Sequence, residues 1–127
     1  MPFILEDLEV YNLAESFSDE IWKIVNEWDY FIKSGLGKQF TNATDSISAN
    51  IAEGYGRYSI KENINFCFYA RGSLMETKSW LKKSFRRKLI DESQFYVLIG
   101  QLELIHLKLN AYIKVLKQNL KKQNKDV

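Results

Sequence analysis

The amino-acid sequence predicts an all-α protein that folds as an antiparallel, up-down-up-down four-helix bundle. Two observations lead to this fold. Apolar residues recur every three or four positions along four long segments, which is the period of a helix that buries one face. The 127 residues include only one proline and six glycines, so little interrupts those segments. A chain of this length is expected to form a single domain, residues 1–127, with a polar, frayed tail at 121–127.

The first predicted helix spans residues 8–28. Asp7 is the expected N-cap, because its carboxylate can accept a hydrogen bond from a free amide of the first turn. The glycines within 34–37 are expected to break the helical pattern. The apolar stripe of this helix steps by three and four residues: Val10, Ala14, Phe17, Ile21, Ile24 and Trp28.

The second predicted helix spans residues 38–54 and is rich in serine, threonine and asparagine, which are weak helix formers. Packing must therefore hold this helix, and its small side chains would let neighbouring helices approach closely. Asn50 is expected at such a tight contact. A glycine C-cap is expected within 54–56.

The third predicted helix begins at a capping box formed by Ser59 and Glu62 and continues to about Lys88. Gly72 lies in its middle. We expect Gly72 to mark a place where another helix backbone comes close, so that a Gly72→Leu change would overpack the contact. The alternative is a glycine that is tolerated at a cost of about 1 kcal/mol relative to alanine.

The fourth predicted helix carries the strongest pattern in the chain. Asp91 and Gln94 form a second capping box at its start. Its main apolar positions step by three and four throughout: Phe95, Leu98, Leu102, Ile105, Leu109, Tyr112, Leu116 and Leu120.

More apolar residues are present than one bundle core can take. The fourth helix carries a second, heptad-like seam: Val97, Leu104, Ala111 and Val115. Such a stripe is typical of an interface and predicts self-association. Residues 1–56 have ten acidic and three basic residues (−7), and residues 57–127 have six acidic and fifteen basic residues (+9). This asymmetry fits either a head-to-tail contact between copies or neutralisation within one bundle.

No catalytic set, metal site or cofactor site can be assembled, so the chain is predicted not to be an enzyme. The single histidine, His106, follows a glutamate at the spacing of di-iron bundles, but such a site needs two of these motifs. Cys67, the only cysteine, is expected to be a small core residue. Glu53 and Glu76 are candidates for a buried polar pair; the alternative for Glu53 is an ion pair with Arg57.

The sequence also bears on location. No apolar run approaches the roughly 18 residues that span a bilayer. The N-terminus lacks the apolar core of a signal peptide. The expected location is therefore the cytoplasm, without a membrane partner.

Basic residues crowd the ends of the third and fourth predicted helices. The candidate nucleic-acid-binding residues are five cations within seven positions: Lys82, Lys83, Arg86, Arg87 and Lys88. Cations of this kind bind RNA phosphates, and neighbouring aromatic residues stack on bases. The alternative is a favourable interaction with the helix dipole, which needs no ligand. The two basic ends are expected at opposite ends of an antiparallel bundle, so they need not form one patch.

Residues 45–57, which read Asp-Ser-Ile-Ser-Ala-Asn-Ile-Ala-Glu-Gly-Tyr-Gly-Arg, are similar to the signature of a bacterial four-helix-bundle family. Its members include proteins encoded in intervening sequences of 23S ribosomal RNA genes. Residues 7–11 and 70–76 extend the resemblance. The positions that carry the structural motif are Asn50, Glu53, Gly54, Arg57, Gly72, Ser73 and Glu76.

The resemblance implies an antiparallel four-helix bundle that assembles as a homopentameric ring. A related member, the accessory protein of diversity-generating retroelements, binds a reverse transcriptase and RNA through a basic surface. Many relatives carry two basic residues where this chain has Thr41 and Asn42, and a neutral residue where it has Asp45. This departure argues against nucleic-acid contacts on the second helix and leaves the basic ends of the later helices as candidates.

Two classes of function follow. The first is a non-catalytic, homo-oligomeric module, a pentamer by resemblance, that binds RNA or assists ribonucleoprotein assembly. The second is a protein-interaction scaffold that does not bind nucleic acid. The first requires basic residues of neighbouring subunits to converge on one face. The second requires an exposed apolar stripe that remains after self-assembly.

Overall fold

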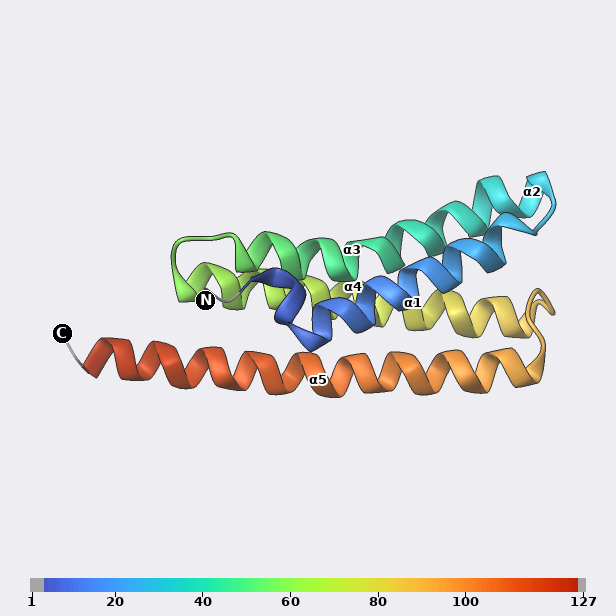
Figure 1. The fold of residues 1–127 in the computed structure, drawn as a ribbon. Coiled ribbons are helices and arrows are strands. Elements are labelled where there is room, and N and C mark those ends of the chain that lie inside the picture. The colour runs from blue at the N-terminus through green and yellow to red at the C-terminus, as the bar shows by residue number, and fades with distance from the viewer. Residues whose placement is uncertain (1–3, 126–127) are drawn as a thin grey trace.

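The computed structural model describes residues 4–125, and within this range it contains helices and no strands. Four long helices run alternately in opposite directions and form the predicted bundle (Figure 1). The long helices are α1 (Glu9–Asn26), α3 (Lys38–Tyr55), α4 (Ile60–Arg86) and α5 (Glu92–Lys125). The short elements are the 3-10 helix η1 (Leu5–Asp7), α2 (Tyr30–Ile32) and the π-helix η2 (Lys33–Gly37).

The core lies between the long helices, since α3 packs on α1 and α4, and α5 packs on α4 and α1. Several core-facing positions are polar. The hydroxyls of Thr44, Thr77 and Ser84 each donate to the carbonyl four residues earlier in the same helix, at 2.8 Å. These side chains are therefore buried with their hydrogen bonds satisfied, Thr44 on α3 and Thr77 and Ser84 on α4, and their small size lets the helices pack closely. The largest fully buried side chains include Phe40, Ile21, Ile47, Ile51, Leu74, Leu81, Leu102, Ile105 and Leu109.

The N-cap of α1 is Leu8, so the prediction that Asp7 caps this helix is wrong. Asp7 belongs to the preceding 3-10 turn, and its carboxylate accepts a hydrogen bond from the Ile4 amide at 3.2 Å. This turn directs the carboxylate back along the chain, away from the free amides of α1.

The predicted break at 34–37 is also wrong. The chain turns earlier, just before Asp29, whose carboxylate accepts from the Ile32 amide at 3.1 Å and caps α2. From there α2, η2 and α3 follow one another without a gap. Gly37 serves packing rather than a turn, because a Cβ at this position would lie 2.7 Å from Val25 Cγ1.

Both predicted capping boxes mark the helix starts correctly, but only half of the Ser59–Glu62 box forms in the described residues, since the Glu62 carboxylate lies near Arg57 instead of accepting from the Ser59 amide. The Ser59 hydroxyl accepts from the Glu62 amide at 3.1 Å, and the Glu62 carboxylate lies 3.9 Å from the Arg57 guanidinium. Asp91 and Gln94 bond reciprocally, at 2.7 and 3.2 Å. Side-chain chemistry within one turn therefore determines where α4 and α5 begin.

Two helix ends complete the fold. Gly56 is the C-cap of α3, as predicted, although its φ of −77° is right-handed. The helix α5 continues to Lys125, so residues 121–125 of the predicted tail are helical. Residues 126–127 lie outside the described range.

The glycine that marks a close helix contact is Gly54 rather than Gly72. Gly72 is exposed, and a Cβ there would have no neighbour within 4 Å, so the predicted packing role of Gly72 is wrong. A Cβ on Gly54 would lie 2.7 Å from Asn63 Oδ1 and 2.8 Å from Phe66 Cβ, because α3 and α4 approach each other here. Asn50 is half-buried, and its side-chain nitrogen donates to the carbonyl four residues earlier at 2.8 Å.

Candidate nucleic-acid interface

The helix α4 ends in a tight, left-handed turn. The Lys88 amide donates to the Phe85 carbonyl at 3.0 Å, and the Leu89 amide donates to the Ser84 carbonyl at 2.9 Å, which is a Schellman motif. Lys88 has a φ of 63°, in the region that favours glycine. A lysine there costs about 1–2 kcal/mol in backbone free energy. The chain thus carries a cation at a position where the backbone favours glycine.

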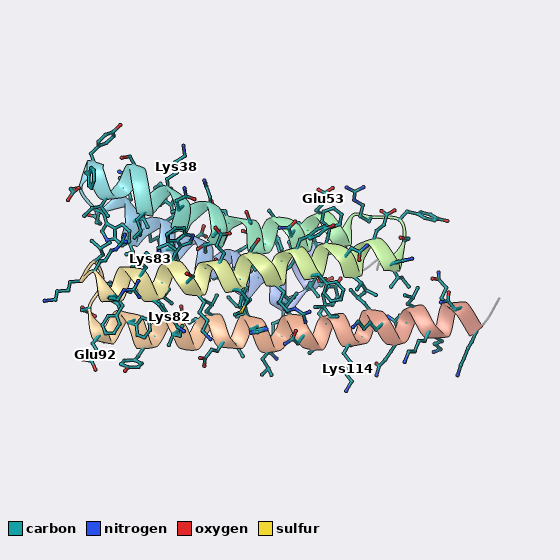
Figure 2. All side chains as sticks on the ribbon, turned by 180° about the vertical axis from the view of Figure 1, so that it is seen from behind. Lys38, Glu53, Lys82, Lys83, Glu92 and Lys114 are labelled. Atoms are coloured by element: carbon teal, nitrogen blue, oxygen red, sulfur yellow. The ribbon has the colours of Figure 1, made fainter. Side chains whose placement is uncertain are left out.

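The α4 basic cluster consists of five cations at this helix end: Lys82, Lys83, Arg86, Arg87 and Lys88. Four of them are exposed, while Lys83 is half-buried with its Nζ 4.7 Å from the centre of the Trp80 ring. Within residues 4–125, none of the five is paired with a carboxylate. Lys82 and Lys83 lie in the same half of the bundle as Lys38 (Figure 2). No carboxylate of the described residues therefore neutralises the α4 basic cluster, which leaves these cations available to bind an anion.

A second basic group occupies the C-terminal part of α5. Figure 2 shows Lys114 well separated along the bundle from Lys82 and Lys83. The two groups therefore lie toward opposite ends of one chain, as the antiparallel order predicts. The second group is exposed and comprises Lys114, Lys117, Lys121, Lys122 and Lys125.

The surface between α1 and α3 is acidic. Asp45 accepts a hydrogen bond from the Ser18 hydroxyl, and Glu15 accepts one from the Ser48 hydroxyl at 2.9 Å. Both carboxylates line a groove of about 200 Å³ between the two helices. Thr41, one of the positions where relatives carry a cation, bonds to its own helix backbone at 3.1 Å. This face of α3 is therefore a poor place for a phosphate.

The acidic and basic halves of the chain remain on different helices. Among the ion pairs of residues 4–125, only Lys108 with Glu9, at 3.3 Å, connects α5 to α1. The other pairs join Arg57 to Glu53 and Glu62 around the α3–α4 connection. Few ion pairs therefore neutralise the two halves within one bundle.

The carboxylates of the structural motif are exposed, so the predicted buried pair of Glu53 and Glu76 is wrong. Glu53 forms the alternative ion pair with Arg57, at 2.9 Å. Glu76 accepts from the Trp80 indole nitrogen at 3.3 Å. The Ser73 carbonyl accepts a side-chain hydrogen bond within α4. These residues stabilise α3, α4 and their connection, and they do not form a site together.

The apolar stripe of α5 consists of five exposed residues: Val97, Leu104, Leu107, Ala111 and Val115. Four of these were expected from the second seam; Leu107, 66% exposed, was missed, although it continues the steps of three and four. At roughly 100° per residue, the stripe lies about opposite the buried face of α5. Leu104 also lines a hollow of about 300 Å³ between α1 and α5. The outer face of α5 therefore presents a regular apolar stripe to solvent.

The groups that could support catalysis are dispersed or buried. Cys67 is fully buried, which confirms that it is a core residue, and burial raises the pKa of its thiol to about 12. His106 is half-buried on α5. No cluster of three or more histidine, cysteine or acidic residues within 4–125 could hold a metal ion.

The buried thiol leads to a testable result. At pH 8, a chromogenic disulfide reagent should label Cys67 slowly in the native protein and rapidly in denaturant, because the thiolate is the reactive form. An unfolded thiol ionises near pH 9, whereas the folded one keeps its proton to about pH 12. The corresponding stability is complete below pH 9 and is lost as the pH rises toward 12, with a slope of up to about 1.4 kcal/mol per pH unit.

Cys67→Ala is the control for this experiment. It should remove the labelling and reduce the alkaline loss of stability, measured by urea unfolding at pH 8 and pH 11. Rapid native labelling at pH 8 would contradict the buried position.

The fold and its surfaces define a class: an antiparallel helical bundle with a basic end, an acidic groove and an apolar outer stripe. A family model of the 23S rRNA-intervening sequence protein matches residues 6–111, and the chain belongs to that family. This confirms the resemblance seen in the sequence. No protein of curated function matches the chain.

A solved structure supports the same assignment. The chain is similar to a crystal structure of a protein of unknown function from the S23 ribosomal protein family of Bacteroides thetaiotaomicron, with 26% identity and a TM-score of 0.68. The match covers 83% of this chain and 98% of that one. None of the helices between residues 4 and 125 combines the length and apolar character needed to cross a membrane.

Proposed function

We propose that this chain is a non-catalytic protein of the cytoplasm that binds RNA, or assists ribonucleoprotein assembly, as a homo-oligomeric ring. The observation that carries the proposal is the α4 basic cluster, five cations at one helix end with no carboxylate paired to them in the described residues. RNA phosphates are suitable ligands for such cations, because each contact releases a condensed counterion. The proposed function needs no metal or cofactor.

The backbone at Lys88 supports the same surface. A residue held at a costly φ is common at functional sites, where the surrounding structure maintains the strain. Lys88 bears its charge at such a position, beside Arg86 and Arg87. Keeping a lysine there lowers the stability of the chain and increases the positive charge at the helix end.

Two features support self-association. The apolar stripe of α5 is the kind of surface that a second copy covers. Charge gives the second feature. The acidic groove of one copy, which contains Glu15 and Asp45, can face the basic helices α4 and α5 of the next copy. Such a head-to-tail contact closes into a ring. The family resemblance suggests five subunits. A ring would bring several α4 basic clusters onto one RNA and raise its affinity through effective concentration.

The experiment that tests this function measures retention of labelled total RNA at two salt concentrations, beside light scattering. With about five phosphate contacts, affinity should fall roughly a hundredfold to five-hundredfold between 50 and 200 mM salt. Light scattering should give a multiple of the chain mass of 14.9 kDa. Absence of RNA binding at 50 mM salt would end the RNA proposal. A monomer at micromolar concentration would end the ring.

A protein-interaction scaffold is the second candidate, and the apolar stripe of α5 favours it. If self-association leaves Leu107 exposed, this stripe can take a protein partner instead of a second copy. Leu107→Lys distinguishes the two uses, because a charge in the contact between copies should shift light scattering toward the monomer. An unchanged oligomer mass, together with absent RNA binding, would favour the scaffold.

A further inference from the structure

A hollow of about 490 Å³ lies at the end of the bundle that carries the α4 basic cluster. We call it the α2–α4 hollow. The helices α2 and η2 form one side, and residues just after α4 form the other. Its apolar lining residues are Phe31, Ile32, Leu36 and Leu89. The volume is within the range of small-molecule sites, roughly 300–1,000 Å³.

The hollow combines a flat apolar surface with a cation. Phe31 is 85% exposed, so its ring presents a large face to solvent at the mouth of the hollow. Arg87 lines the hollow and also belongs to the α4 basic cluster. Arg86 and Lys88 flank Arg87 in the sequence, so a phosphate held by either side chain would lie close to the hollow. The ligand that matches both features is planar, apolar on its faces and attached to a phosphate.

We propose that the α2–α4 hollow accepts an unpaired base of single-stranded RNA while the α4 basic cluster holds the adjoining phosphates. The proposal rests on the RNA-binding function argued above and names the form of RNA that is bound. A base in a duplex is stacked and paired, and side chains cannot enter the deep, narrow major groove of A-form RNA. Single-stranded RNA can turn a base outward and stack it on an aromatic ring.

The wall of the hollow contains a position that is open to substitution. Gly35 lines the hollow, and a Cβ on it would meet no atom within 4 Å. A Cβ added here would displace no neighbour, so a larger side chain can be introduced at the wall of the hollow. Gly35 also lies inside the π-helix η2, a rare element that is frequent at functional sites.

The test uses fluorescence anisotropy to measure the affinity of the protein for a labelled RNA of about 12 nucleotides. The affinity for the single strand is compared with the affinity for the same RNA annealed to its complement. Phe31→Ala should lower affinity for the single strand by about fivefold to 150-fold, the effect of one lost stacking contact. Gly35→Leu should also lower the affinity for the single strand, because the leucine side chain blocks the hollow. Both variants should bind the duplex like the parent protein.

Matched controls exist elsewhere in the chain. Tyr58→Ala removes a fully exposed aromatic side chain at the α3–α4 connection, far along the bundle from α2 (Figure 1). Gly72→Leu adds the same side chain as Gly35→Leu at a glycine that is also open, but outside the hollow. Both controls should bind the single strand like the parent. Thermal melts of all four variants should confirm that the bundle is folded.

The outcomes separate the two proposals. If the parent binds neither RNA, the proposed function fails. If the parent binds RNA and Phe31→Ala and Gly35→Leu match their controls, the base site is wrong while the α4 basic cluster stands. If both variants lose affinity for the single strand and for the duplex to the same extent, the hollow does not recognise an unpaired base, and the base site is again wrong.

Discussion

Gly54→Ala should lower the free energy of unfolding by about 1–2 kcal/mol. Overpacking a close contact typically costs about 1–3 kcal/mol, and alanine returns up to about 1 kcal/mol through its better helix propensity. The added Cβ would lie 2.7 Å from Asn63 Oδ1, 2.8 Å from Phe66 Cβ and 3.0 Å from the Asn63 carbonyl oxygen. The last atom belongs to the α4 backbone, so the two helices must separate. Urea unfolding at fixed protein concentration measures the loss.

The matched control is the same substitution in the next helix. Gly72 is exposed on α4 and a Cβ there has no neighbour within 4 Å, so Gly72→Ala should raise stability by about 1 kcal/mol through helix propensity alone. The two substitutions should therefore shift the melting temperature in opposite directions. A Gly54→Ala variant as stable as the parent would show that α3 and α4 are not in close contact at this position.

These two glycines show what periodicity predicts and what it leaves open. Apolar period and capping boxes predicted the fold class and the starts of α4 and α5, because both signals act within one or two helical turns. A close contact depends on which turns of two helices meet. Gly54 continues the apolar spacing of Ile47 and Ile51, which places it on the buried face of α3, but that spacing does not reveal that Asn63 and Phe66 of α4 lie against it.

The wrong prediction of a helix break at 34–37 has a related cause. Glycines at 35 and 37 suggested a break, yet the turn occurs before Asp29, which caps the following helix. An aspartate ahead of an apolar segment was a usable signal that the glycines obscured. The π-helix that contains both glycines has no reliable signature in a single sequence.

The candidate site was predictable in part. The α4 basic cluster could be named from the sequence because its five cations lie within seven positions. The α2–α4 hollow could not be named, since Phe31 and Arg87 are far apart in sequence and meet only through the bundle. Nor could the sequence show that the cations of the cluster have no carboxylate partners in the described residues, because this depends on where the bundle places the acidic helices α1 and α3.

The double variant Arg86→Glu/Arg87→Glu should bind RNA much more weakly than the parent while it keeps its fold and oligomer mass. Both side chains are exposed and neither is paired with a carboxylate in the described residues, so their removal breaks no ion pair. Losing two of about five phosphate contacts should weaken binding roughly tenfold to a hundredfold and reduce the salt slope by about two.

Two further variants decide whether this loss belongs to the α4 basic cluster. Lys121→Glu/Lys122→Glu makes the same change in charge at the far end of α5, where the cations are equally exposed, and should bind RNA more like the parent. Lys88→Gly removes one cation while it relieves the left-handed strain, so it should gain about 1 kcal/mol of stability and lose about one unit of salt slope. A mutation that stabilises the bundle and still weakens RNA binding cannot act through unfolding. If the α5 variant loses RNA and the α4 variant does not, the interface lies at the opposite end of the bundle and the assignment to α4 is wrong.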